Sequence, residues 1–388
     1  MRDSFLNHDW ITDEHRAYGD SIRRFLSDEF QPNRAAWTAA GVVDRGFWIK
    51  AGAMGILGAS APEEWGGQGL SRSFDLVTFL EQARIADTGW GISVHNIVLH
   101  YIVALATPDQ KARWLPRLCS GEWVGAIAMT EPGTGSDLQA VRTTARADGN
   151  EYVLNGSKTF ITNGQNAGFV IVVAKTDPAA GARGISLIAL ETEGAEGFQR
   201  GRNLEKLGMK RQDTSELFFD EVRVPRANLI GDEEGKGFGQ LMIQLPWERL
   251  MLSYMALGAA RCAYEDTLRH TRARRAFGQR IMDFQNTRFK LAEVKTEIEL
   301  LAAFLDRLMA ELEAGTLTAE RAAMAKWWST EMQGRTVDTC LQLHGGYGYM
   351  SEYRISELYA DARVQRIYGG TNEIMREIVA RSIDRDEI

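Results

Sequence analysis

The sequence has few cysteines and no long apolar run, and these absences exclude several kinds of protein. It contains three cysteines in 388 residues, and none of them forms a Cys-x-x-Cys pair. A disulfide scaffold or a cysteine-rich zinc site is therefore not expected. No apolar run reaches the roughly 18–20 residues of a membrane-spanning helix, and the first residues lack the apolar core of a secretory signal. These features predict a reducing, cytoplasmic location and no membrane span.

The sequence also lacks an excess of positive charge. Its net charge is −7 and its pI is about 5.6, which argues against nucleic acid and anionic membranes as partners. The basic cluster at residues 270–275 is short and local. It fits a small polyanionic molecule better than a duplex.

Several familiar catalytic motifs are missing as well. There is no Walker A motif and no Gly-x-Ser-x-Gly motif. His95 and His100 are five residues apart, a spacing that does not align two ligands on one helix face, so we predict no metal site. The glycine-rich stretch 52–58 has no strand before it, which excludes a dinucleotide-binding fingerprint.

The pattern along the chain predicts an α+β protein with three segments. Residues 1–122 are expected to form an all-α domain, in which Ile22, Leu26 and Phe30 share one helix face. Residues 123–233 are rich in strand patterns, with a turn signature at 148–150. Residues 234–388 contain long periodic stretches near 238–270, 283–313, 318–343 and 354–382, which indicate a four-helix bundle.

Three glycine-rich segments could bind a ligand or could be ordinary turns and helix caps. Residues 130–137 follow a predicted strand, and their small side chains would let backbone N–H groups approach a phosphate or a heterocycle. Residues 342–349 end a predicted helix, and residues 367–374 lead into one. Composition alone leaves both interpretations open.

Taken together, four motifs resemble the acyl-CoA dehydrogenase family over nearly the whole chain. They are residues 128–137, 158–164, 274–278 and 342–348. The resemblance implies that FAD lies between the β domain and the C-terminal bundle. It also implies α,β-dehydrogenation of an acyl-CoA to the trans-2-enoyl-CoA, in fatty-acid or related acyl-CoA catabolism, with electron-transferring flavoprotein as oxidant.

The resemblance also assigns roles to individual residues. The FAD-binding positions are expected to be Met129, Thr130, Gly135, Ser136, Phe160, Ile161, Thr162, Arg274, Phe277, Gln285, Gln342, Leu343, His344, Gly345, Gly346, Thr371, Asn372 and Glu373. Arg274, Phe277, Gln285 and 342–346 resemble the group that a neighbouring subunit lends to the cofactor, which implies a homo-oligomer, in this family usually a tetramer built as a dimer of dimers.

The position of the catalytic base distinguishes two branches of the family. Many members carry a glutamate directly before Gly-Thr in the C-terminal loop, but Gly369 occupies that position here. A second branch, which includes long-chain and isovaleryl-CoA dehydrogenases, carries the glutamate on the first helix of the bundle. Glu248 lies there, on a face with Leu241, Leu245, Leu252 and Met255. Without the resemblance, a surface glutamate paired with a helical neighbour would be the simpler interpretation.

We therefore expect Glu248 to be the base and the Gly369 backbone N–H to be a hydrogen-bond donor to the thioester carbonyl. Ser136, Pro246, Trp247, Arg249, Gly369 and Gly370 are the expected substrate-binding positions. An acyl-CoA oxidase, a flavin monooxygenase or a non-catalytic acyl-CoA binder on the same fold are the alternatives. Gly239, where the resemblance leads one to expect a bulky aromatic residue, leaves the acyl chain length open.

Overall fold

Six α-helices form the first part of the chain, as far as the structure describes it. In the computed structural model, which describes residues 3–383, Ile22, Leu26 and Phe30 are all buried, as their spacing predicts. Residues 1–2 and 384–388 of the predicted first and third segments lie outside the described residues. The helices are α1 (Asp13–Phe25), α2 (Arg34–Ala40), α3 (Arg45–Ala53), α4 (Arg72–Arg84), α5 (Ile92–Leu105) and α6 (Pro108–Cys119).

Seven strands form one mixed sheet in the middle of the chain. Strand β4 pairs in parallel with β1 and antiparallel with β5, and it joins the remaining strands through one β2 contact. The turn signature at 148–150 is confirmed, because Asp148 pairs with Glu151 across the β2–β3 hairpin. The strands are β1 (Val124–Ala128), β2 (Thr144–Asp148), β3 (Glu151–Thr162), β4 (Ala167–Lys175), β5 (Ile185–Glu191), β6 (Phe198–Asn203) and β7 (Thr214–Pro225).

The C-terminal part is helical, but the prediction of a fourth long helix is wrong. Helices α7 (Gly237–Ala273), α8 (Gln285–Glu313) and α9 (Ala319–His344) match the first three periodic stretches. The fourth stretch is divided into α10 (Arg354–Ala362) and α11 (Asn372–Ile383). Two consecutive glycines at positive φ, Gly369 and Gly370, interrupt the apolar periodicity, because this backbone conformation cannot continue a right-handed helix.

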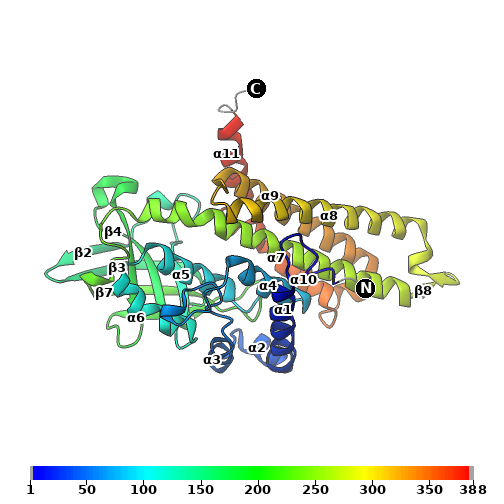
Figure 1. The fold of residues 1–388 in the computed structure, drawn as a ribbon, viewed down its shortest axis with the longest axis horizontal. Helices are drawn as coiled ribbons and strands as arrows, with labels where there is room; N and C mark the ends of the chain where they lie inside the picture. Colours follow the sequence, from blue (N-terminus) through cyan, green and yellow to red (C-terminus); the bar gives the residue numbers. More distant parts are fainter. Residues whose placement is uncertain (1–2, 384–388) are drawn as a thin grey trace.

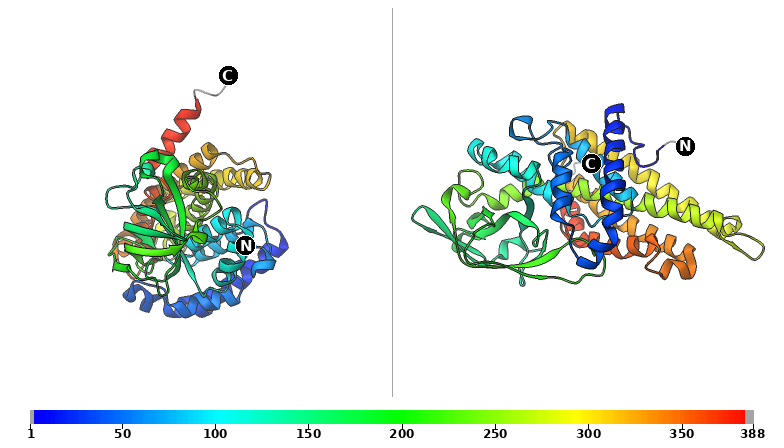
Figure 2. Two further views of the ribbon diagram at one scale, coloured as in Figure 1. Left: turned by 90° about the vertical axis from the view of Figure 1, so that its left-hand side faces the viewer. Right: turned by 90° about the horizontal axis from the view of Figure 1, so that it is seen from below.

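Figure 1 shows an elongated molecule whose β domain and helical tip lie at opposite ends. The long helix α7 connects these ends. Helices α4 and α5 pack against it, and α5 also packs against the β domain. The right-hand view in Figure 2 shows the same separation of the sheet from the hairpin β8 (Arg275–Ala276) and β9 (Gln279–Arg280). Within residues 3–383, no helix is both long and apolar enough to cross a membrane.

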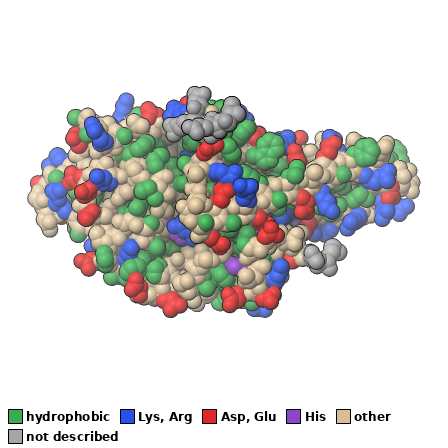
Figure 3. All heavy atoms as spheres, turned by 45° about the horizontal axis from the view of Figure 1, so that its top comes forward, with side chains coloured by type: hydrophobic (Ala, Val, Ile, Leu, Met, Phe, Trp, Pro, Cys, Tyr) green, Lys and Arg blue, Asp and Glu red, His purple; other side chains and the backbone are tan. Residues whose placement is uncertain are grey.

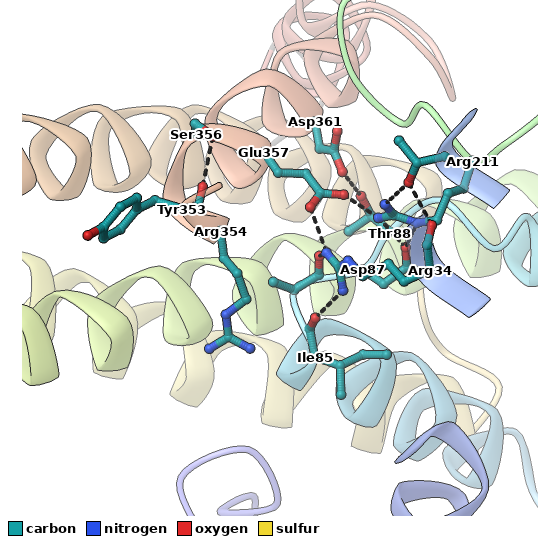
Figure 4. A network of polar contacts seen from close by, with 12 residues as sticks. Arg34, Ile85, Asp87, Thr88, Arg211, Tyr353, Arg354, Ser356, Glu357 and Asp361 are labelled. Atoms are coloured by element: carbon teal, nitrogen blue, oxygen red, sulfur yellow. Dashed lines mark hydrogen bonds and ion pairs between the residues drawn. The ribbon is translucent and has the colours of Figure 1, made fainter. Parts of the chain in front are cut away.

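A buried polar network joins all three parts of the chain (Figure 4). Arg211, from the connection between β6 and β7, pairs with Asp87 of the first segment at 2.8 Å and with Glu357 of α10. Arg34 also pairs with Glu357, at 2.6 Å. Asp361 of α10 accepts hydrogen bonds from the Met209 backbone N–H and from Thr88 Oγ1. The network fixes α10 against the rest of the chain just before the glycine loop.

Arg211→Met is expected to lower the stability of the whole protein. The substitution leaves Asp87, which is fully buried, without its cation, and breaking a buried pair on one side costs about 3–5 kcal/mol. Arg223→Met is a matched control, because Arg223 pairs with Asp148 and Glu151 at an exposed site. The melting temperatures of the two variants test the difference. Equal, small shifts would show that the network contributes no more than a surface pair.

Candidate functional site

Glu248 lies on α7 where α4 and α5 cover that helix. Its side chain is buried, and Tyr101 of α5 donates its phenol O–H to Glu248 Oε1 at 2.9 Å. Burial raises the pKa of Glu248 to about 7, although the Tyr101 hydrogen bond and the Arg249 charge lower it. A carboxyl group with this pKa exchanges its proton readily near neutral pH, as a general base must.

The residues on either side of Glu248 are also largely buried. Trp247 packs edge-on against His100 of α5, and the Arg72 guanidinium lies over its ring. Arg249 is 5% exposed, and its Nε has no hydrogen-bond partner within residues 3–383. Helix α7 continues through Pro246 without a break.

Gly369 and Gly370 face this part of α7. Their φ angles are 65° and 89°, values at which a residue with a side chain is strained. A Cβ on Gly369 would lie 2.6 Å from Leu252 Cδ1, and Leu252 follows Glu248 by one helical turn. A Cβ on Gly370 would lie 2.6 Å from Met375 Cε and 3.9 Å from Arg249 Nη2. The fold thus brings the predicted base and the predicted backbone donor to one place.

The residues after the glycine pair begin α11. Thr371 is its N-cap and accepts a hydrogen bond from the Ile374 backbone N–H. The Asn372 side chain is buried, with bonds to Lys326, Thr330 and Glu331. Glu373 is exposed, and its pKa is lowered by its own backbone N–H and by the Thr371 side chain. Thr371 and Glu373 remain open to a ligand, whereas Asn372 positions the loop.

A buried ion pair holds the two motifs of the β domain together. Lys158 Nζ donates to Glu131 Oε1 at 2.8 Å and to the Met129 backbone oxygen at 3.0 Å. Burial lowers the pKa of Lys158 to about 8, and Glu131 opposes this effect. Residues 131 and 134 exchange both backbone hydrogen bonds, so the motif begins with a tight turn. The Thr159 N–H donates to Thr130 O at 2.9 Å, which sets residues 129–130 beside residues 158–162.

This part of the β domain presents an open surface with one strained aromatic residue. Phe160 is 67% exposed and has a φ of 60°, within an irregular stretch of β3. Backbone strain of this kind occurs mostly at functional sites. Neither Gly133 nor Gly135 would bring a Cβ within 4 Å of another atom. Ser136 is exposed and Thr162 half-buried, while Ile161 is buried in the sheet. An exposed ring beside a glycine turn fits a planar cofactor.

The remaining predicted cofactor residues lie at the far tip of the helices. Phe277 is 94% exposed, and the Arg274 guanidinium lies over the ring of Tyr347. His344, at the end of α9, stacks on His270 of α7 with ring centroids 4.3 Å apart. Gln285 begins α8 at the same end of the molecule. A single chain therefore does not place this group near the β-domain motifs (Figure 1). The group consists of Arg274, Phe277, Gln285, Gln342, Leu343, His344, Gly345 and Gly346.

Two contact residues of the site were not predicted from the sequence. Tyr101 gives no local signal, because its partner is 147 residues away in the chain. Lys326 lies on α9 among the buried residues Ala322, Ala323, Ser329 and Thr330. A lysine on a buried helix stripe is a signal that sequence reasoning could have used. Within residues 3–383 no cluster of three or more potential metal ligands occurs.

Family models match almost the entire chain. The N-terminal, middle and C-terminal domains of acyl-CoA dehydrogenase match residues 12–122, 126–222 and 235–383. The chain belongs to the acyl-CoA dehydrogenase family. The predicted family, and the predicted order of a helical, a β and a second helical domain, are confirmed.

Individual relatives extend the likeness over the whole length. The mitochondrial long-chain specific acyl-CoA dehydrogenase of Mus musculus is 47% identical over 97% of this chain and 88% of that protein. The mitochondrial isovaleryl-CoA dehydrogenase of Pongo abelii is 33% identical over 97% and 90%. A crystal structure of an acyl-CoA dehydrogenase from Geobacillus kaustophilus is 44% identical, with a TM-score of 0.94 over 97% of this chain and 100% of that chain.

Tyr101→Phe is expected to raise the pKa of Glu248 above about 7. The substitution removes a hydrogen bond that stabilises the ionised carboxylate, and the expected shift is roughly one pH unit. The carboxyl stretch in infrared difference spectra, assigned with Glu248→Gln, measures the titration. Tyr152→Phe is the control, because it removes a buried phenol that donates to Glu234 instead. An unchanged or lower pKa in Tyr101→Phe would contradict the role of the phenol.

Gly369→Glu is expected to weaken acyl-CoA binding by about tenfold or more. The new side chain would meet Leu252 and place a second carboxylate near Glu248, which raises at least one of the two pKa values. Gly315→Glu controls for backbone strain, because Gly315 has a φ of 69° but faces open space. Calorimetric titration with an acyl-CoA compares the variants. Full affinity in Gly369→Glu would show that the loop does not border the ligand.

Proposed function

We propose that this protein catalyses the FAD-dependent α,β-dehydrogenation of an acyl-CoA thioester, with Glu248 as the base that removes the α-proton. The observation that carries the proposal is the buried Glu248 carboxyl group, with a pKa near 7, opposite the Gly369–Gly370 loop. Gly369 cannot accept a proton. Glu248 thus takes over the role that other family members give to the residue before Gly-Thr.

The contacts around Glu248 suit proton abstraction. Tyr101 donates to Oε1, and among residues 3–383 no group donates to Oε2, which is the proposed proton acceptor. Burial by α4 and α5 excludes water, and in a dry site electrostatic interactions are stronger. As the proton leaves, negative charge develops on the thioester oxygen, and a hydrogen-bond donor aimed at that oxygen lowers the barrier. The backbone N–H of Gly369 is the proposed donor.

The β-domain residues fit the isoalloxazine end of FAD. The Lys158–Glu131 pair fixes the two motifs beside each other, and the glycine turn leaves backbone groups accessible. In this proposal Met129, Thr130, Gly135, Ser136 and residues 160–162 hold that end, and Thr371 and Glu373 hold the ribityl-phosphate end. When bound, FAD supplies the acceptor for the β-hydride.

The substrate class is proposed to be long-chain acyl-CoA. The relative with 47% identity bears the long-chain name, and the position of Glu248 on the first bundle helix resembles the family branch that includes long-chain members. Ser136, Pro246, Trp247 and Arg249 are the proposed substrate-binding residues beside the glycine loop. Electron-transferring flavoprotein and a cytoplasmic location remain predictions; the two relatives described above are mitochondrial by name.

The helical surface supports assembly into a homo-oligomer. Large apolar side chains are exposed on α8 and α9, among them Phe289, Leu300 and Trp328, and Figure 3 shows green apolar patches among charges along this half of the molecule. Exposed apolar surface of this kind is typical of interfaces. A tetramer in which Arg274, Phe277, Gln285 and residues 342–346 reach the cofactor of a partner subunit is therefore proposed.

Glu248→Gln is expected to retain FAD and acyl-CoA binding while flavin bleaching by acyl-CoA slows at least about a hundredfold. The amide has nearly the same shape as the carboxyl group but cannot take the α-proton. Anaerobic stopped-flow absorbance, with acyl-CoAs from short to long and branched, measures the rate and the preferred chain.

Glu234→Gln is the matched control, because Glu234 also accepts a hydrogen bond from a buried tyrosine but lies outside the site. Bleaching of Glu248→Gln at the unaltered rate would refute the assignment of the base. Failure of every acyl-CoA to bleach the unaltered enzyme would instead favour a non-catalytic binder or a monooxygenase. Rapid reoxidation of the reduced enzyme by oxygen would identify an oxidase.

A further inference from the structure

Lys326 is a buried ammonium group that the proposed chemistry does not yet use. It lies on α9 with no exposed surface. Its Nζ donates to the Gly370 backbone oxygen at 2.7 Å and to Asn372 Oδ1 at 3.0 Å. Neither acceptor carries a charge. Within residues 3–383 Lys326 makes no ion pair at 4.0 Å or less, and Glu373 and Glu331 act on it only from a longer distance. A buried charge without a directly paired counterion is costly.

A second cation lies on the other side of the same loop. The Arg249 guanidinium of α7 approaches Gly370, and its side chain is also buried. Burial lowers the pKa of Lys326 to about 7, and the charge of Arg249 lowers it further, while Glu373 of α11 and Glu331 of α9 oppose this effect. Arg249, together with Lys326 in its protonated form, creates a positive potential beside the loop, where an anion would be stabilised.

The loop itself needs support from its neighbours. Gly369 and Gly370 have no side chains with which to pack, and glycine is the most flexible residue in the unfolded and the folded chain. Leu252 of α7 limits the loop on one side, and Lys326 holds the Gly370 carbonyl on the other. Lys326 thus fixes the Gly370–Thr371 peptide, at the C-terminal end of the flexible pair that carries the Gly369 N–H.

We infer that Lys326 is a positioning residue that fixes the Gly369–Gly370 loop so that its backbone N–H stabilises negative charge on the thioester oxygen of the substrate. This inference rests on the proposed function, because it assigns the loop to the acyl-CoA carbonyl. Lys326 does not touch the reacting atoms. It acts through the Gly370 peptide and through its positive charge.

The test separates proton abstraction from hydride transfer. In a 3-thia-acyl-CoA, sulfur replaces the β-carbon, so the α-proton can still be removed but no hydride can leave. The holoenzyme is incubated with this ligand in D₂O, and NMR follows the exchange of the α-protons for deuterium. Calorimetry measures the affinity for the same ligand, so that binding and carbanion stabilisation are recorded independently.

In Lys326→Met, α-proton exchange is expected to slow by about tenfold or more, because the donor to Gly370 is lost, while the affinity for the thia ligand changes less than about threefold. Lys326→Gln keeps a hydrogen-bond donor without the charge, and its exchange rate is expected to lie between those of the unaltered enzyme and Lys326→Met. This variant replaces Lys326→Met in the test if Lys326→Met does not fold. Gln333→Met is the control for burial of a methionine on α9, because Gln333 is buried on the same helix with no bond to the loop.

Unchanged exchange in Lys326→Met and Lys326→Gln would overturn the inference and leave the proposed function intact. Exchange and affinity that fall in the same proportion would also overturn it, since that result indicates lost binding rather than lost positioning. No exchange with the unaltered enzyme would overturn the proposed function and this inference together. Absence of exchange in Glu248→Gln alone verifies that the assay reports the base.

Discussion

The burial of the Glu248 carboxyl group is the constraint around which the site is built. Removal of a carboxylate from water strongly favours its neutral form, and only the Tyr101 hydrogen bond and the nearby Arg249 charge oppose that effect. The balance requires that α5, from the first domain, stays docked on α7, from the third. The ion pairs of Arg211 and the hydrogen bonds of Asp361 hold these domains together and thereby maintain the base in its dry environment (Figure 4).

The β domain handles a buried charge in the opposite way. Lys158 and Glu131 neutralise each other directly, and the Thr143 hydroxyl and the backbone N–H groups of Arg142 and Thr143 satisfy the remaining carboxylate lone pairs. Such a pair contributes rigidity more than net stability. The pair lies close to the strained Phe160 backbone, because Lys158 precedes Phe160 by two residues in β3. The buried Glu131 carboxylate is thus kept ionised in a structural role, whereas the buried Glu248 carboxyl group has a pKa near neutral pH.

The sequence predicted the elements whose signals are local. The hairpin turn at 148–150, the strands and the three long bundle helices follow from turn residues and apolar periodicity, and Glu248 and the glycine loop follow from the family motifs. The break of the fourth helix at Gly369 and Gly370 was missed, because the periodicity on both sides is helical. Tyr101 and Lys326 were missed for a different reason. Their roles depend on contacts across 147 and 44 residues of chain. No local pattern gives the partner of Tyr101, whereas the position of Lys326 on a buried helix stripe was a local signal that went unused.

The hairpin β8–β9 and the end of α9 lie at the end of the molecule opposite the sheet of their own chain (Figure 1). If the cofactor spans two subunits as proposed, each protomer carries two half-sites that belong to different cofactor molecules. Cofactor binding and subunit association are then coupled equilibria, so that each one stabilises the other through mass action. Dilution would release the cofactor, and saturating cofactor would hold the assembly together, so that the flavin would act as a reporter of quaternary structure as well as a redox group.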